Sequence, residues 1–380
     1  MTETVSLLRI EEYNEDLIYI KLTKGLKDLK IAIPQEKKVL IKPNMIAQNF
    51  PFQCTTTHPA VVGAICRILK ENKCDLIIGD SSAFYQEGNT AKAFETTGLG
   101  AVAEKYKVET IAFEEEPSSL FSNQEGRILK KILLTDRLKQ VEYIINVPKL
   151  KTHTFFMLSG AVKNLFGLVP GGAKYEYHFL HGQGREVFGE KLTDLYGIVR
   201  PSLTIMDAIM GLEGLGPSAA GTPRQTGILG IAQNPFALDF IFSRIIGFDP
   251  YGIESTSAGI MRGFLQDPEK IDVQGDFNQL PRIYYKKPKT GKEKKPGHRG
   301  WLYNAVVVRP QIVPGRCTLC DICAELCPLN AITMSQLPEI DLEICLNCYL
   351  CFYKCPEGAI KLKGNFFNPL VKKMRRVFKL

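Results

Sequence analysis

The sequence predicts an α/β protein with a mostly parallel sheet and flanking helices, followed by a second, smaller domain. Three observations support this fold class. Segments typical of strands and of helices alternate along the chain up to about residue 285. Polar residues repeatedly follow the predicted strands, and eight of the 11 cysteines fall in two runs near the C-terminus. A chain of 380 residues is long enough to hold both domains.

Short apolar segments rich in β-branched residues predict the strands. Helices are predicted where apolar residues recur at helical spacing. We expect Thr57 to be the N-cap of one helix, with Pro59 in its first turn, and Asp207 to end the last strand. The predicted strands lie at residues 5–9, 38–41, 75–78, 108–113, 128–134, 142–147 and 202–206, and the predicted helices at 14–26, 90–97, 235–246 and after residue 57.

The cysteines near the C-terminus form two runs with the same spacing. Each run reads C-x2-C-x2-C-x3-C-P, which is typical of bacterial proteins with two cubane clusters, and the runs are offset by 28 residues. In such proteins the fourth cysteine of each run ligates the other cluster. The spacing therefore predicts two [4Fe–4S] clusters, one held by Cys317, Cys320, Cys323 and Cys355, the other by Cys345, Cys348, Cys351 and Cys327.

Zinc sites and disulfides are the alternatives for these cysteines. Structural zinc sites usually show two C-x2-C pairs separated by a longer insert, and nothing in the sequence suggests secretion. Residues 309–363 instead resemble a bacterial two-cluster ferredoxin domain, which is a small α+β fold that carries electrons. Cys54, Cys66 and Cys74 lack ligand spacing, so we expect them to be core or surface thiols.

Polar side chains follow four of the predicted strands. Ligands of open α/β sheets bind outside the carboxyl ends of the strands, so we expect these side chains to meet in one crevice. A further pair, Lys163 and Asn164, is expected on a helix that lines the same crevice. The residues that follow the strands are Lys42, Asn44, Asp80, Ser81, Lys149, Lys151, His153 and Asp207.

The lysines would make this crevice a cationic pocket, suited to a carboxylate, a phosphate or an anion formed by reduction. Asp80 or Asp207 could order the lysines or move protons. The alternative is that the lysines are solvated loop residues, and a less favoured one is a metal bound by His153, His178 and His181. The candidate catalytic residues are Lys149, Lys151, His153, Lys163, Asp80 and Asp207, and the candidate binding residues are Lys42, Asn44, Ser81 and Asn164.

Five short motifs together resemble the family called domain of unknown function 362. The resemblance covers about residues 1–285 and implies a ligand site at the motifs, without implying a particular reaction. Domains of this family are often joined to a two-cluster ferredoxin domain, in agreement with the cysteine runs. The motifs are Lys42-Pro-Asn44, Gly79-Asp-Ser81, Asn146-Val-Pro-Lys-Leu-Lys-Thr-His153, Gly160-Ala-Val-Lys-Asn164 and Asp207-Ala-Ile209.

The net charge of +8 is concentrated in two segments. Residues 286–308 are predicted to be a basic linker and a junction strand, and residues 364–380 a basic amphipathic tail helix. Because the rest of the chain is not basic, nucleic acid is not an expected partner. We expect the apolar stripe of the tail to pack on the α/β domain, and contact with an anionic membrane surface is the less favoured alternative.

These features predict an electron-transfer protein of the cytoplasm. No apolar run approaches the ~18 residues that span a bilayer, and the N-terminus lacks the features of a signal peptide. We expect the two clusters to pass electrons to or from the lysine-lined crevice, where a small anionic substrate is reduced. The alternative is a non-catalytic carrier whose α/β domain docks onto a larger redox enzyme. In either case a redox protein is an expected partner.

Overall fold

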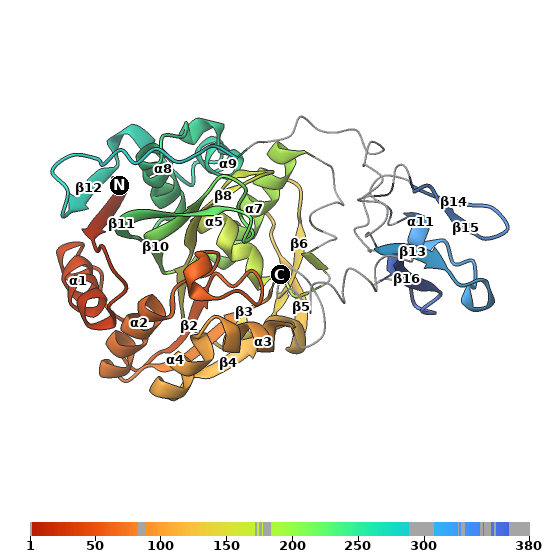
Figure 1. Cartoon of the computed structure of the whole chain (residues 1–380), viewed down its shortest axis with the longest axis horizontal. Coiled ribbons are helices and arrows are strands. Elements are labelled where there is room, and N and C mark those ends of the chain that lie inside the picture. Colours follow the sequence, from red (N-terminus) through yellow and green to blue (C-terminus); the bar gives the residue numbers. More distant parts are fainter. Residues whose placement is uncertain are drawn as a thin grey trace. The chain divides into compact units, whose positions relative to one another are not determined.

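The computed structural model divides the chain into two compact units (Figure 1). One unit is formed by residues 1–174 and 184–290, and the other contains the C-terminal cysteine runs. The predicted basic linker beyond residue 288, the junction strand up to residue 307 and the tail beyond residue 364 lie outside the described residues. The structure describes residues 2–82, 89–171, 173–174, 177, 184–288, 308–325, 327, 331–342, 345, 351–352 and 355–364.

A mixed, mostly parallel sheet forms the centre of the first unit. The strand order is β12-β1-β11-β10-β7-β2-β3-β4, with β8 paired to β10 and β9 paired to β8. Within the described residues, antiparallel pairing in this sheet is confined to β11 and β9, which confirms the predicted fold class. The strands are β1 (Thr4–Arg9), β2 (Lys38–Pro43), β3 (Asp75–Asp80), β4 (Glu109–Ala112), β7 (Tyr143–Val147), β8 (Lys149–His153), β9 (Met157–Ser159), β10 (Leu203–Glu213), β11 (Thr222–Ala232) and β12 (Asp272–Gly275).

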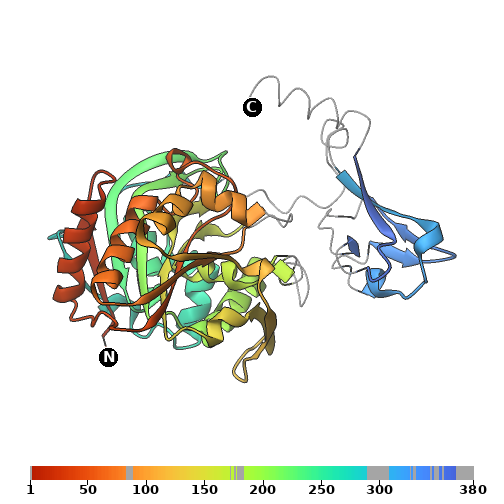
Figure 2. The same ribbon diagram turned by 90° about the horizontal axis from the view of Figure 1, so that it is seen from below.

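Helices cover both faces of the sheet (Figures 1 and 2). On one face, the helices bury apolar stripes against the sheet, so that Ile18, Leu22 and Ile65 join a single core with the strand residues Val39 and Ile41. This face carries α1 (Glu15–Asp28), α2 (Pro59–Glu71), α3 (Asn89–Thr96) and α4 (Leu99–Tyr106), and the other face carries α5 (Ala161–Asn164), α7 (Arg185–Val199), α8 (Pro235–Ile245) and α9 (Glu254–Met261).

Shorter elements connect these layers. A separate antiparallel hairpin pairs β5 with β6. The hairpin strands are β5 (Ser118–Ser122) and β6 (Lys131–Thr135), and the 3-10 turns of this unit are η1 (Pro51–Gln53), η2 (Phe113–Glu115), η3 (Asp136–Lys139), η4 (Leu165–Leu168), η5 (Pro250–Gly252) and η6 (Pro268–Lys270).

The structure corrects the predicted start of α2. The N-cap is His58, whose Nδ1 accepts a hydrogen bond from the Ala60 N–H at 3.1 Å. Thr57 has another role, because its hydroxyl donates to the Val147 carbonyl at 2.6 Å and accepts from the Asn44 N–H at 2.8 Å. Thr57 therefore joins the ends of β2 and β7 instead of capping the helix.

Two further corrections concern the strands near the predicted crevice. Asp207 does not end its strand, because β10 continues to Glu213, and Asp207 pairs in register with Lys149. Lys149 to His153 form strand β8 instead of a loop after β7. Neither β11 nor α7 was predicted from the sequence. In a strand, successive side chains point to opposite faces of the sheet, so the strand conformation of residues 149–153 determines the face to which each lysine points.

The strand order reverses between β2 and β7. From β2 the chain adds β3 and β4 on one side, and it then returns to place β7 and β10 on the other side. Lys42 at the end of β2 is paired with Asn146 near the end of β7. Such a reversal is where open α/β sheets bind ligands, so the fold brings the polar ends of these strands together.

The second unit has an internal repeat. Strand β13 (Val308–Ile312) pairs with β16 (Ile360–Gly364), and β14 (Ile332–Met334) pairs with β15 (Pro338–Ile340). Ile312 lies opposite Ile360, and Ile332 lies opposite Ile340. At the 28-residue offset Ile312 corresponds to Ile340 and Ile332 to Ile360, so both pairs join the same two positions of the repeat. The unit also contains η7 (Pro314–Arg316) and α11 (Ile322–Glu325).

No helix in the part of the chain that the structure describes has the length and apolar character needed to cross a bilayer.

A buried carboxylate on α7 anchors the β5–β6 hairpin to the helical layer. Asp194 accepts the N–H groups of Arg127, Ile128 and Leu129 at 2.8–2.9 Å. It also accepts a hydrogen bond from Arg262 Nη1 at 2.6 Å, and the Arg262 side chain is only 5% exposed. One carboxylate thus satisfies three backbone donors and a buried guanidinium.

Replacing this carboxylate should destabilise the first unit. We expect Asp194→Ala to lower the free energy of unfolding by about 3–5 kcal/mol, because Arg262 loses its nearest partner while it stays buried. Urea unfolding followed by circular dichroism measures the change. The control Asp272→Ala, on the exposed edge strand β12, should shift it by less than about 0.5 kcal/mol. Equal effects of the two substitutions would contradict the anchoring role.

Candidate functional site

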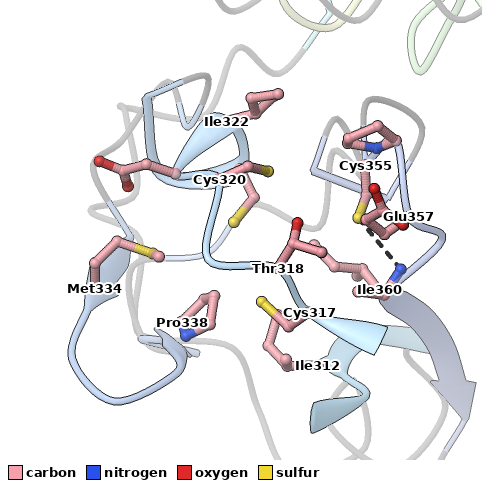
Figure 3. A pocket seen from close by; sticks show the side chains of 14 residues that line it. Ile312, Cys317, Thr318, Cys320, Ile322, Met334, Pro338, Cys355, Glu357 and Ile360 are labelled. Atoms are coloured by element: carbon pink, nitrogen blue, oxygen red, sulfur yellow. Dashed lines mark hydrogen bonds between the residues drawn. The ribbon is translucent and has the colours of Figure 1, made fainter. Parts of the chain in front are cut away.

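A cavity of about 360 Å³, including the part open to solvent, lies in the second unit (Figure 3). Apolar side chains such as Ile312, Met334 and Ile360 form much of its wall. Sulfur is the donor that iron–sulfur clusters require, so this lining fits a cubane. The cavity is also lined by the four cysteines that the spacing assigns to one cluster, namely Cys317, Cys320, Cys323 and Cys355.

The backbone of this loop is shaped to carry the ligands. Leu319 and Asp321 adopt left-handed conformations, with φ of 56° and 63°, on either side of Cys320. A leucine rarely takes this conformation, and such residues gather at functional sites. Two N–H groups also donate to cysteine sulfurs at 3.2 Å. One bond runs from Ala331 to Cys327, and the other, drawn as a dashed line in Figure 3, runs from Ala359 to Cys355. Hydrogen bonds to the ligand sulfurs are among the features that set the potential of an iron–sulfur cluster.

The other cysteine set is described only in part. Cys327 and Cys345 are half-buried, and Cys351 is buried beside Ile332 and Ile360. Cys348 lies outside the described residues. The two halves nevertheless share the amide-to-sulfur bond at equivalent positions, which is what a duplicated cluster-binding loop requires.

In the α/β unit, two of the predicted lysines form buried ion pairs. Lys42 Nζ lies 2.8 Å from Asp80 Oδ1, and Lys149 Nζ lies 2.9 Å from Asp207 Oδ2. All four side chains are 3% exposed or less. Asp80 also accepts from the N–H of Met45. These carboxylates order the lysines and balance their charge, so the open cationic pocket expected from sequence is smaller than predicted.

Tyr13 completes the second ion pair. Its hydroxyl accepts from Lys149 Nζ at 2.6 Å and donates to Asp207 Oδ1 at 2.8 Å. Its ring stacks on His58, with centroids 3.6 Å apart. Burial raises the pKa of Tyr13 well above its usual range and lowers the pKa of His58 to about 4. Both rings are therefore uncharged at neutral pH.

A ladder of amides orients Lys151. Lys151 Nζ donates to Asn44 Oδ1 at 2.5 Å and to the Thr55 carbonyl at 2.7 Å. Asn44 in turn donates to Asn164 at 2.9 Å, and Asn164 donates to Asn146 at 2.8 Å. No carboxylate among the described residues pairs with Lys151. Burial, with smaller effects from nearby lysines, lowers its pKa well below the usual range.

Lys163, on α5, differs from the other lysines of the site. It is partly exposed, and its ammonium has no ion pair or hydrogen bond with the described residues. It lies over three aromatic rings, with centroids at 5.2 Å for Phe156, 5.8 Å for Phe166 and 5.4 Å for Phe188. Burial lowers the pKa of Lys163 to about 8. It is therefore a cation at neutral pH that lacks a counter-ion in the described part of the chain.

The remaining predicted residues shape the backbone. His153 Nδ1 accepts the N–H groups of Phe155 and Phe156, which turns the chain from β8 into β9. The Ser81 hydroxyl accepts from the N–H of Gly171 at 3.1 Å. His178 and His181 lie outside the described residues, so a histidine metal site remains an alternative from sequence alone.

Several residues of the site were missed from sequence. Tyr13 and His58 belong to the Lys149 network. Lys174 Nζ donates to the carbonyls of Ser81 and Ser82, and burial lowers its pKa to about 8. Asp239 accepts from the N–H groups at the start of α5, and burial raises its pKa to about 7. None of these four residues stood in a motif, and each contacts residues that lie far from it in sequence.

The α/β fold and the cysteine-lined cavity define the class of this protein. It is an iron–sulfur electron-transfer protein that carries two [4Fe–4S] clusters. A family model for a 4Fe-4S dicluster domain matches residues 316–359, and the model called Domain of unknown function (DUF362) matches residues 39–244. The chain belongs to the DUF362 family, fused to a C-terminal dicluster ferredoxin domain.

Individual proteins are also similar to this chain. The "Thylakoid-associated protein sll1697" of Synechocystis is 32% identical over 262 residues, which are 68% of this chain and 79% of that protein. The "Uncharacterized ferredoxin MJ0155" of Methanocaldococcus jannaschii is 39% identical over 55 residues, 14% of this chain and 36% of that protein. A solved lactate racemase apoprotein from Thermoanaerobacterium thermosaccharolyticum covers 63% of this chain and 57% of its own, at 14% identity and a TM-score of 0.40.

Metal content should follow from the cysteine sets. We expect about eight irons and eight acid-labile sulfides per chain in anaerobically purified protein. Cys355→Ser should damage the cluster of the first run and Cys327→Ser the other, each leaving about four irons. Cys74→Ser, a buried thiol of the α/β core, should retain all eight. Iron and sulfide analysis of the three variants measures this, and zinc as the main metal would refute the assignment.

Proposed function

We propose that the two clusters exchange single electrons with the lysine site of the α/β unit, where a small anionic substrate is reduced. The observation that supports this proposal is that the Lys163 ammonium has no ion pair or hydrogen bond with the described residues. An ammonium with no counter-ion among the described residues, beside the buried Lys151, is a site that an anion would stabilise. A reducing compartment such as the cytoplasm would suit a protein with these clusters.

Each polar residue then has a proposed role. Lys163 binds the anion, with Lys151 next to it. The Asn44–Asn164 ladder orients Lys151, and the Lys42–Asp80 pair orders Ser81 and the backbone after β2. The network of Lys149, Tyr13 and Asp207 holds a proton beside the anion, which is where an acid is needed when a substrate takes up electrons.

Anion binding should depend on pH through Lys163. Its pKa is about 8, so the ammonium is present below that pH and is lost above it. We expect affinity for acetate to be constant from pH 6 to 7.5 and to fall by about tenfold per pH unit above 8, until binding is lost. Isothermal titration of the cluster-loaded protein measures this.

Matched variants identify the lysine responsible. Lys163→Met should abolish acetate binding, and Lys163→Arg should keep it above pH 8. Lys73→Met, which removes a side chain that is 80% exposed, should leave both affinity and pH profile unchanged. Binding that is independent of pH, or that survives in folded Lys163→Met, would overturn the proposed role of Lys163.

The second candidate function is a carrier that passes electrons to a separate redox protein. A specific observation favours it, since Cys320 is exposed and the neighbouring Leu319 is 51% exposed. Asp321 and Glu357 also line the cavity and are exposed, so two carboxylates lie at the surface beside this cluster site. A partner that docks here would present a basic face and an apolar contact for Leu319.

Electron transfer to a basic acceptor tests the carrier function. We expect dithionite-reduced protein to reduce cytochrome c quickly at low ionic strength and more slowly as salt rises. Leu319→Asp and Asp321→Asn should each lower the stopped-flow rate about threefold or more. Glu339→Gln, in the same unit but outside the cavity lining, should not. An equal decrease in Asp321→Asn and Glu339→Gln would mean that overall charge, not a docking surface, sets the rate.

A further inference from the structure

We propose that the anion bound at Lys163 is a monocarboxylate on an aromatic or similarly flat apolar body, and not a phosphate ester. This inference rests on the proposed function, because it specifies the ligand of the same site. Four sets of contacts around α5 support it: the rings beneath Lys163, an exposed ring next to them, the occupied start of α5, and the ion pairs of the neighbouring lysines.

The surroundings of Lys163 are aromatic. Phe156 comes from the turn between β8 and β9, Phe166 from η4 and Phe188 from α7, and all three rings are 8% exposed or less. Phe156 and Phe188 stack on each other with centroids 4.4 Å apart. An anion at this ammonium therefore gives up much of its water. A singly charged carboxylate loses less hydration free energy there than a doubly charged phosphate.

An exposed aromatic ring continues this surface outward. Phe155 is 46% exposed, and it packs edge-on against Phe156 with centroids 4.5 Å apart and an interplanar angle of 90°. Its position is fixed by the two backbone bonds to His153 Nδ1. A flat apolar group whose carboxylate reaches Lys163 can stack on Phe155, and burying that surface favours binding.

The start of α5, where a phosphate would find backbone donors, is already occupied. Asp239 accepts the N–H groups of Ala161 at 2.6 Å and Val162 at 3.0 Å. A Cβ on Gly160 would lie 2.1 Å from Asp239 Oδ1, so the glycine is needed for this contact. The Asp239 side chain thus occupies the backbone donors that would otherwise be available to a phosphate.

The charge balance of the site points to a monoanion. Lys42 is paired with Asp80 and Lys149 with Asp207, and burial disfavours the charged form of Lys151. Lys174 also lacks an ion pair among the described residues, but its ammonium is bonded to the carbonyls of Ser81 and Ser82. Lys163 thus offers one ammonium that has neither an ion pair nor a hydrogen bond with the described residues. One carboxylate matches that charge, whereas a phosphate ester carries up to two at neutral pH.

Comparing three probe anions tests the inference. We expect the cluster-loaded protein at pH 7 and constant ionic strength to bind benzoate about tenfold more tightly than acetate, and inorganic phosphate more weakly than either. Phe155→Ala should lower benzoate affinity about tenfold and leave acetate affinity unchanged. Leu120→Ala, which truncates a side chain that is 60% exposed on the β5–β6 hairpin, should change neither.

The outcomes separate this inference from the proposed function. If acetate binds through Lys163 but benzoate binds no more tightly, or phosphate binds most tightly, the substrate class is wrong while anion binding stands. If benzoate affinity survives Phe155→Ala, the stacking surface is wrong. If none of the three anions binds, Lys163 is a structural cation held by its three rings, and both proposals fall together.

Discussion

The cost of burying lysines at the carboxyl edge of the sheet governs the architecture of the α/β unit. A buried ammonium must find acceptors, or it is lost as a charge. Lys42 and Lys149 find carboxylates, and Lys151 finds an amide and a carbonyl. The packing around them follows from these contacts: a Cβ on Gly167 would lie 2.1 Å from Asp80 Oδ1. Segments distant in the chain are thereby held within hydrogen-bond distance.

How far the sequence predicts these features depends on the range of the interactions. The cluster ligands could be assigned because their spacing is local and because it repeats. The polar residues after the strands could be gathered into one site because parallel strands end at one edge. Tyr13 could not, since its partner Asp207 lies 194 residues further along the chain. The extension of β10 past Asp207 also depends on β11, a strand that pairing stabilises and that local sequence did not reveal.

The structure also corrects the positive charge that the sequence predicted for the lysine site. Counting lysines overestimated the positive charge of the site, because a sequence does not show which lysines meet an aspartate. The structure divides them into a paired set and a small remainder near Phe156. Binding an anion there would favour the protonated form of Lys163, so ligand binding and proton uptake would be coupled above about pH 8.

Cys355 belongs to the second cysteine run but lines the cavity of the first run. The two halves of the second unit therefore depend on each other. Strand β13, which precedes the first run, pairs with β16, which follows the second. A chain ending after the first run would lack both a sulfur ligand and a strand partner. During synthesis on the ribosome, therefore, the first cavity cannot be completed until the second run has emerged.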